Sequence, residues 1–531
     1  MPITDTTRLT GSITDWSAFW LFTDRNEHIR RFLSYLYDET PHDTILFFYG
    51  EGGNGKSWLM RFLSEYCCKQ LAESVRSHLS TISYNELIGF FTEDESSPIF
   101  PHAHLDFGMP PYGDARPKEP ASALLMLRRS LARYGLRFPL YDYATLLYLH
   151  KTVGLTKDRI NYLFPPKEAS ALGAILDILR DATAGKFRKA GLDLIKKYLF
   201  RGGQKQFTLW RQKRGLSQSD VETIERMDPY LELVDKLPIL FAQDLNAAMQ
   251  LEHAPSRVVL FFDTYDAFRG TERALPSDAY FAREEWFRAL LVNLDLSLGI
   301  VTVVLSRDKP QWQNAAIFRI PQEYLDVHNI GYFSNSDAHV LLERAGVTDP
   351  DLRQALVTYA SISPNEVHPY YLGLCLDVAL AAKHQGTLFP QDLTSIQSEE
   401  LARKGNEAIG RLLRYAGTHI EYAVRALSAC RAFNFEIYQM LGEALAFQAT
   451  PMDFDILISY SFVRRTHQHG DGWFCIDDLL RKLYRESHDE ITLQAQAILG
   501  QYFLEGDHKG EPMAVTEALY HIKRLRLEIA N

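Results

Sequence analysis

TILFFYGEGGNGKSWLM, residues 44–60, joins a short apolar run to a glycine-rich segment and the start of a helical pattern. Its second half has the spacing G-x-x-x-x-G-K-S, which is typical of a P-loop when a buried strand precedes it and a helix follows. The run ILFFY at 45–49 is predicted to be that strand. We therefore predict an α/β P-loop core, a parallel sheet with helices on both of its faces.

Each residue type in this segment suits a bound phosphate. Glycines let backbone N–H groups turn inward around the phosphate, and the helix that follows adds the positive end of its dipole. Lys56 is expected to reach the β- and γ-phosphate oxygens, and the Ser57 hydroxyl to hold Mg²⁺. The predicted nucleotide-binding residues of the loop are Gly50, Glu51, Gly52, Gly53, Asn54, Gly55, Lys56, Ser57 and Trp58. The alternative is a glycine-rich turn without a ligand.

Composition bounds the kind of protein. The 531 residues are too many for one hydrophobic core and predict about three or four domains. The formal net charge of −10 argues against a surface built throughout for nucleic acid. No apolar run approaches the roughly 18 residues needed to cross a membrane, and the start of the chain has no signal pattern. With five scattered cysteines, these features predict a cytoplasmic protein without a membrane partner.

A second apolar run ends in a carboxylate. Residues 258–263, VVLFFD, indicate a buried parallel strand that delivers Asp263 to the carboxyl edge of the sheet. A Walker B aspartate occupies that position and completes the Mg²⁺ shell through water. Asp266 follows where it is placed to orient or activate the attacking water. We predict Ser57 and Asp263 as the metal site and Asp266 as the general base.

Three further strands are expected, at 99–107, at 299–305 and near 324–327. Ser306 and Arg307 follow the second of these, so Arg307 is expected to face the γ-phosphate; an exposed loop arginine is the alternative. Helices are expected at 28–39, 121–136 and 280–294.

Two patterns leave alternatives open. His102, His104 and Asp106 alternate along the predicted strand at 99–107 and would share one face, but no further ligand cluster supports a metal site there. Residues 186–214 are rich in basic side chains with interleaved aromatics, which fits either a solvated helical face, the preferred interpretation, or a patch for nucleic acid or a protein partner. The basic residues are Lys186, Arg188, Lys189, Lys196, Lys197, Arg201, Lys205, Arg211, Lys213 and Arg214.

The pattern becomes helical from residue 334 onward. Residues 460–463 and 473–476 flank the turn THQHGDG and predict a β-hairpin, and a helix, DDLLRKLYRE, follows it. Helices, hairpin and helix in this order suggest a winged helix. The last stretch, 489–531, predicts a pair of amphipathic helices.

On these residues the chain resembles the STAND class of P-loop signal-transduction ATPases, which includes the NACHT and NB-ARC switches. The resemblance covers about residues 20–490 and also rests on FTDR at 22–25 and VHP at 367–369. It implies that Arg25 lies beside adenine and ribose, that Pro369 approaches the adenine, and that Arg307 reads the γ-phosphate as sensor 1. Asp266 matches the second acid of the family's Asp-x-x-acid element.

The chain departs from the family in two places. Ala267 stands where NACHT proteins usually carry another acid, and Ile476-Asp477-Asp478 stands where many relatives carry Met-His-Asp. The histidine that touches the β-phosphate is therefore missing from that motif. The last helix pair resembles the start of a tetratricopeptide array, although such arrays usually need about three repeats.

The sequence predicts five parts. They are a short tail (1–20), a nucleotide-binding domain (21–330) with a helical insertion at about 140–250, a helical domain (331–410), a winged-helix-like domain (411–488) and a C-terminal helix pair (489–531). The resemblance implies a slow ATPase that binds ATP, ADP and Mg²⁺ and signals by domain opening and homo-oligomerisation, with an unknown protein trigger or effector, as in prokaryotic antiviral defence. One alternative is an ATP-dependent DNA-binding regulator or loader, which acids at the start of the predicted recognition helix disfavour. Another is a P-loop metabolic kinase.

Overall fold

The computed structural model describes residues 25–76, 79, 91, 97–109, 116–152, 222–224, 226–268, 278–385, 418–458, 460, 462–466, 472–476, 480–481, 484, 489–505 and 512–529. Contacts within the chain divide these residues into two compact units. The sheet unit comprises the described residues of Glu27–Gly50 and Lys56–Asn329, and the C-terminal unit those of Met1–Asn26, Glu51–Gly55 and Ile330–Asn531. The predicted tail, the residues FTD at 22–24, the basic stretch 186–214, Asp477 and Asp478 lie outside the described residues.

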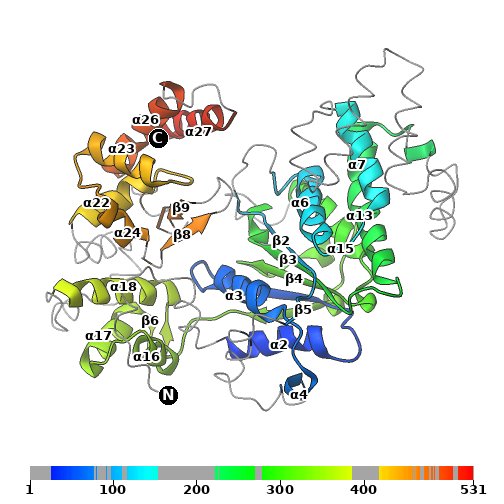
Figure 1. Ribbon diagram of the computed structural model, residues 1–531, viewed down its shortest axis with the longest axis horizontal. Helices are drawn as coiled ribbons and strands as arrows, with labels where there is room; N and C mark the ends of the chain where they lie inside the picture. The colour runs from blue at the N-terminus through cyan, green and yellow to red at the C-terminus, as the bar shows by residue number, and fades with distance from the viewer. Residues whose placement is uncertain are drawn as a thin grey trace. The chain divides into compact units, whose positions relative to one another are not determined.

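Five parallel strands form the sheet in the order β2-β3-β4-β1-β5 (Figure 1). They are β1 (Ile45–Tyr49), β2 (His102–Asp106), β3 (Val258–Asp263), β4 (Ile300–Ser306) and β5 (Leu325–Asn329). All residues of β3 and β4 are buried, as expected of parallel strands covered on both faces. The predicted parallel α/β sheet is confirmed, and β1 and β3 have the predicted bounds.

Helices cover both faces of this sheet. On one face, the Phe32 ring of α2 (Asn26–Tyr37) lies 5.6 Å from the Phe261 ring, and Arg31 Nε of α2 lies 2.6 Å from Asp326 Oδ2 of β5. On the other face, Phe47 and Phe262 join a hydrophobic cluster with four helices. These are α6 (Pro120–Ala132), α7 (Pro139–Thr152), α13 (Val234–Met249) and α15 (Glu285–Asn293).

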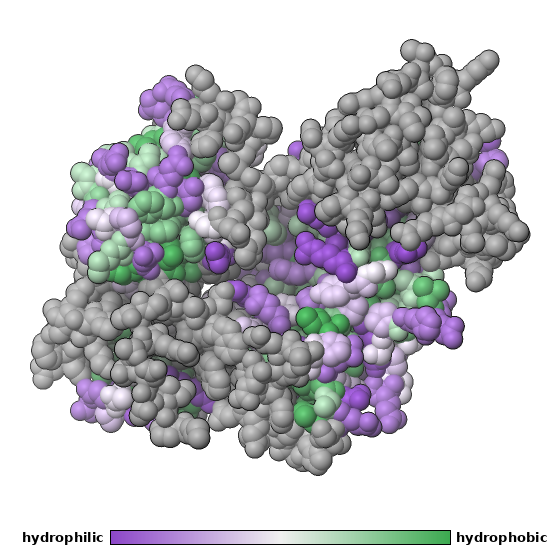
Figure 2. All heavy atoms as spheres, in the orientation of Figure 1, coloured by the Kyte–Doolittle hydropathy of each residue, from purple (hydrophilic) through white to green (hydrophobic). Residues whose placement is uncertain are grey.

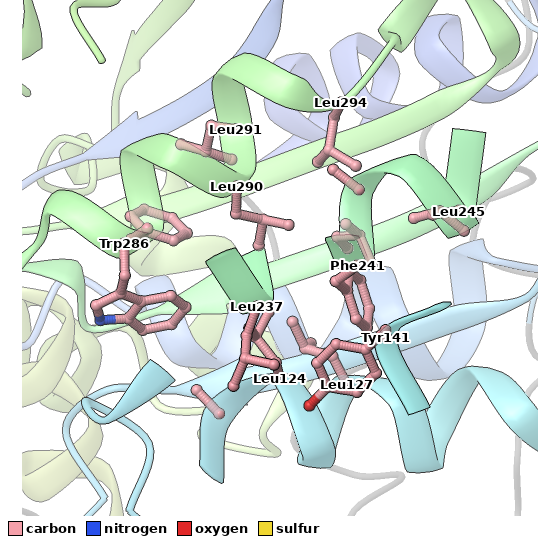
Figure 3. Packing of buried hydrophobic residues seen from close by; sticks show 14 of the residues in the cluster. Leu124, Leu127, Tyr141, Leu237, Phe241, Leu245, Trp286, Leu290, Leu291 and Leu294 are labelled. Carbon is pink, nitrogen blue, oxygen red and sulfur yellow. The ribbon is translucent and has the colours of Figure 1, made fainter. Parts of the chain in front are cut away.

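The side chains of these four helices interlock in a continuous core (Figure 3). Leu124 and Leu127 of α6 and Tyr141 of α7 face Phe241 of α13, whose ring meets that of Tyr141 edge-on at 5.3 Å. A buried ion pair also joins α6 to α7, with Arg128 Nε and Nη2 donating to the Asp142 carboxylate at 2.8 and 2.7 Å. The described ends of the predicted insertion, α7 and α13, therefore belong to the core of the sheet unit.

The predicted helix at 280–294 is wrong in one respect: two helices, α14 (Asp278–Arg283) and α15, replace it. Glu284 leaves the helical conformation, with φ −103° and ψ 4°. Its buried carboxylate accepts a hydrogen bond from Arg288 Nη1 at 2.5 Å, which ties the break to the first turn of α15.

Short elements complete the sheet unit. They are α3 (Lys56–Phe62), η2 (Leu63–Cys67), α4 (Glu73–Arg76), η3 (Pro229–Leu233), η4 (Tyr265–Phe268), η5 (Leu296–Leu298), η6 (Trp312–Asn314) and η7 (Gln322–Tyr324).

The C-terminal unit is mainly helical and contains two hydrophobic clusters. The first is built by α16 (Asn335–Arg344), α17 (Pro350–Ala360) and α18 (Pro369–Gln385), with the short strands β6 (Ser361–Ser363) and β7 (Glu366–Val367). The second is built by α22 (Thr418–Leu427), α23 (Phe435–Leu445), α24 (Pro451–Ile458), β8 (Val463–Thr466), β9 (Trp473–Ile476), α26 (Glu490–Glu505) and α27 (Pro512–Ile529).

The predicted hairpin exists, but its first strand begins later than expected. β8 pairs antiparallel with β9, with Val463 opposite Ile476 and Thr466 opposite Trp473. The rings of Tyr460 and Phe462 instead stack on each other, with their centroids 5.1 Å apart. Both side chains are buried in the hydrophobic cluster of the C-terminal unit, ahead of the first residue of the strand. Only isolated residues of the helix predicted after the hairpin are described, so the winged helix stays a prediction.

The described surface mixes polar and apolar side chains, with apolar ones visible over α22–α24, where Met452 and Ile456 of α24 are exposed (Figure 2). Among the described residues, no helix is both long and apolar enough to span a bilayer.

A buried polar network ties the last helix pair to the rest of its cluster. Arg431 Nη2 donates to Glu517 Oε1 of α27 at 2.5 Å. His521 Nδ1 lies 2.6 Å from Gln496 Oε1 of α26, and Gln496 Nε2 donates to the Ala429 carbonyl at 3.2 Å. α26 and α27 are therefore built into the C-terminal unit through specific hydrogen bonds as well as apolar contact.

This network predicts that acid weakens the C-terminal unit. Burial, with the charges of Arg431 and Arg481, lowers the pKa of His521 from 6.5 to about 3. Between these values the unfolded chain binds a proton that the folded chain does not, so stability falls as pH drops below about 6.5, by up to about 1.4 kcal/mol per pH unit. Urea unfolding from pH 7 to 5 should show this loss, and His521→Gln should flatten it. An equal slope in both proteins would contradict the assignment.

Candidate functional site

The P-loop follows β1 and runs into α3, as its motif requires. Gly53 and Gly55 have φ values of +86° and +81°, which only glycine adopts without strain. Gly50 N donates to the Ser306 carbonyl at the end of β4 at 3.2 Å. Lys56 Nζ donates to the Gly50 carbonyl at 2.7 Å, so the lysine folds back over its own loop.

The sheet order brings two aspartates together at the carboxyl edge. Asp106 ends β2 directly opposite Asp263, which ends β3. Asp263 is buried, accepts a hydrogen bond from the Ser57 hydroxyl, and accepts another from Thr264 N at 2.7 Å. Burial and the charge of Asp106 raise the pKa of Asp263 to about 7, although Ser57, Thr264 and Lys56 act in the opposite direction. The structure thus brings the two predicted metal ligands, Ser57 and Asp263, into contact.

Asp266 and Arg307 lie against each other. The Arg307 amide donates to Asp266 Oδ1 at 3.0 Å, and Arg307 Nε lies 3.3 Å from Asp266 Oδ2. β4 lies between β1 and β3 in the sheet, which places the residues after β4 between the P-loop strand and the strand of Asp263. The predicted base and the predicted sensor are therefore partners in this structure.

In the C-terminal unit, Arg25 holds the tip of the P-loop. It is buried and donates from Nη2 to the Asn54 and Gly331 carbonyls, both at 2.9 Å. Asn54 Nδ2 donates to the Ile330 carbonyl at 3.0 Å. The structure therefore shows the guanidinium of Arg25 on the loop backbone, where it fixes the position of Asn54.

The segment VHP also meets the loop tip. A Cβ placed on Gly53 would lie only 2.7 Å from His368 Cε1 and 3.0 Å from Tyr370 Cβ. Pro369 begins α18 directly after His368. On the same loop, Tyr332 donates a hydrogen bond to Glu51. Neither Tyr332 nor His368 was expected at the loop from sequence.

The two loop glycines offer a matched pair for a stability prediction. Gly53→Ala adds a clash with His368 to the cost of a positive φ, whereas a Cβ on Gly55 meets nothing within 4 Å. We expect Gly55→Ala to destabilise the protein by about 1 kcal/mol and Gly53→Ala by about 2–3 kcal/mol. Thermal unfolding without nucleotide checks the order, and equal losses would show that His368 does not crowd the loop.

Two charged residues at the carboxyl edge were not predicted as part of the site. Asp106 had a signal, because it ends a strand as Asp263 does, but only the sheet order shows that the strands are neighbours. Lys118 had none. Its Nζ donates to the Ala267 carbonyl at 2.7 Å, and burial lowers its pKa while the charges of Asp266 and Asp106 raise it.

Three other residues that the sequence singled out are Trp58, His102 and His104. Trp58 lies on α3, with the Arg61 guanidinium 5.9 Å from its ring centroid. His102 and His104 share β2 with Asp106, but no group of three metal-ligating side chains is found within the described ranges.

The fold and the loop together define a P-loop α/β protein with a helical C-terminal unit. No protein-family model matches the chain, and the comparison with curated proteins found no match. Among solved structures, the Aeropyrum pernix Orc1 protein in complex with DNA is similar at 12% identity over 88% of this chain and 96% of that chain. The TM-score is 0.29, so this similarity adds no argument about fold or function.

Proposed function

We propose that this protein is an ATP-binding, slowly hydrolysing switch of the STAND type. The observation that carries the proposal is the contact between the Ser57 hydroxyl and the buried Asp263. Ser57 directly follows Lys56 of the loop. A P-loop serine and a strand-end aspartate that meet in this way are the two protein groups that hold the Mg²⁺ of a nucleoside triphosphate.

The carboxyl edge fits a magnesium ion. Asp263 and Asp106 are neighbouring carboxylates, and the raised pKa of Asp263 reflects a buried negative charge without enough positive charge around it. A divalent cation supplies that charge and neutralises phosphate oxygens. Ser57 and Asp263 would hold the ion, with Asp106 beside them, while Lys56 binds the phosphates and Asp266 orients the attacking water.

Slow turnover suits the geometry of Asp266. Its carboxylate accepts a hydrogen bond from the Arg307 amide and faces the Arg307 guanidinium, so both of its oxygens already have a partner that an attacking water must displace. A slow hydrolysis step would act as a timer for the ATP-bound state.

The switch itself rests on the resemblance and on the loop contacts. Arg25, Tyr332 and His368 belong to the C-terminal unit and contact loop residues of that unit, so a ligand that moves the loop would act on them directly. We propose that ATP opens the nucleotide-binding, helical and winged-helix-like domains and lets protomers associate, and that a protein trigger starts this change. Signalling in prokaryotic antiviral defence is the role that the resemblance implies.

The wild-type protein tests the proposal. Light scattering should show a higher mass with ATP and Mg²⁺ than with ADP, and slow phosphate release should occur without an acceptor. No nucleotide binding would overturn the proposal, and phosphate release that requires an acceptor would favour a kinase. Salt-dependent binding to random DNA, without a nucleotide-dependent change in mass, would favour the DNA-binding regulator.

A further inference from the structure

Asp266 is held by Arg307 through two contacts of different kinds. One comes from the Arg307 backbone, whose amide donates to Oδ1 at 3.0 Å without involving the side chain. The other comes from the side chain, whose Nε lies 3.3 Å from Oδ2. The Asp266 side chain is 15% exposed and that of Arg307 is 43% exposed, so the carboxylate is anchored while the guanidinium is at the surface.

A second cation stands beside the same carboxylate. Lys118 Nζ donates to the carbonyl of Ala267, the next residue; burial lowers the pKa of Lys118, and the charge of Asp266 opposes that shift. Asp266 would therefore keep a positive neighbour and a backbone donor if the Arg307 guanidinium moved away. The loss of a partner is costly mainly for a buried charge that is left uncompensated, and Asp266 would not be left so.

We propose that Asp266 limits the preference for triphosphate over diphosphate, because it holds the Arg307 guanidinium until a γ-phosphate takes it. Lys118 is the positioning residue that balances the Asp266 charge after this exchange. The proposal rests on the function proposed above, since it needs a nucleotide on the P-loop, and it gives Asp266 a role beyond orienting water.

The energetics favour an exchange in one direction. A partly exposed ion pair contributes little, and this one is a single contact through Nε. A γ-phosphate can accept paired, charge-assisted hydrogen bonds from a guanidinium, and such bonds are among the strongest hydrogen bonds in proteins. A diphosphate lacks that group, so the Arg307–Asp266 pair persists when ADP is bound. ATP alone competes with Asp266, and this competition lowers its affinity.

A double-mutant cycle isolates the exchange. Asp266→Asn keeps an oxygen for the Arg307 amide but removes the charge that holds the guanidinium. Titrations with Mg²⁺ and a non-hydrolysable ATP analogue should show about fivefold tighter binding for Asp266→Asn, the size of an exposed pair, with ADP affinity unchanged. In the Arg307→Ala background, Asp266→Asn should change analogue affinity by less than about twofold.

The controls separate exchange from general repulsion. Asp308→Asn removes a negative charge from the same exposed loop. It should change the affinity for the ATP analogue equally in the wild-type and Arg307→Ala backgrounds. The proposal would be overturned if Asp266→Asn increased the affinity for the ATP analogue as much in Arg307→Ala as in the wild type. It would also be overturned if Asp266→Asn did not increase that affinity at all. If wild-type protein binds neither nucleotide, the proposed function itself fails, which is a distinct result.

Lys118 gives an independent measurement. Lys118→Gln should lower the affinity for the ATP analogue and leave ADP affinity unchanged, because Asp266 then keeps its hold on Arg307. Lys118→Arg should restore the preference, which a role in loop structure alone would not predict. Equal loss of both affinities in Lys118→Gln would remove Lys118 from the exchange.

Discussion

Lys56→Ala is expected to abolish measurable ATP binding while the protein stays folded. The substitution removes the fixed positive charge of the P-loop from the β- and γ-phosphates. Hydrogen bonds to charged groups contribute about 1.5–3 kcal/mol each, so two such contacts correspond to a loss of about a hundredfold or more in affinity. Lys56 lies outside the hydrophobic cluster of the sheet unit, so the free energy of unfolding should change by less than about 1 kcal/mol.

Calorimetric titration with ATP and Mg²⁺, together with urea unfolding, measures both quantities. Lys309→Ala is the matched control, because Lys309 Nζ lies 5.0 Å from the Tyr49 ring centroid near the same end of β1 but outside the motif. The control should bind ATP as the wild type does. Undiminished affinity in Lys56→Ala would remove the nucleotide site from this loop.

Asp266→Asn should retain nucleotide and Mg²⁺ but lose turnover by about 10²–10⁴-fold, the range for a general base. Asp263→Asn should act differently, because Asp263 meets Ser57 and the amide would weaken the Mg²⁺-dependent step itself. A titration of the hydrolysis rate against Mg²⁺ concentration therefore distinguishes the effects of the two substitutions.

In that titration, Asp266→Asn should lower the maximal rate at every Mg²⁺ concentration, whereas Asp263→Asn should shift the curve to higher Mg²⁺. Wild-type hydrolysis by Asp266→Asn would mean that another group activates the water. The Asp106 carboxylate is then the first candidate, since it ends the strand beside Asp263.

Sequence alone was enough for the local features. Five apolar residues before G-x-x-x-x-G-K-S define β1, and the run that ends at Asp263 defines β3, because each signal lies within a few consecutive residues. The helix at 280–294 was predicted without its break at Glu284, where the backbone leaves the helical conformation. The domain boundaries, the winged helix and the roles of the site residues stay predictions.

What the tertiary structure alone decided is which distant residues meet. Strand order in a parallel sheet depends on how whole strands pack, and no short run of residues encodes it. The order β2-β3-β4-β1-β5 sets Asp106 beside Asp263 and places the end of β4 between β3 and β1. The sequence by itself therefore determined the P-loop and its acids. Packing decided that Arg307 pairs with Asp266 and that Arg25 holds the loop backbone, because these contacts join residues far apart in the chain.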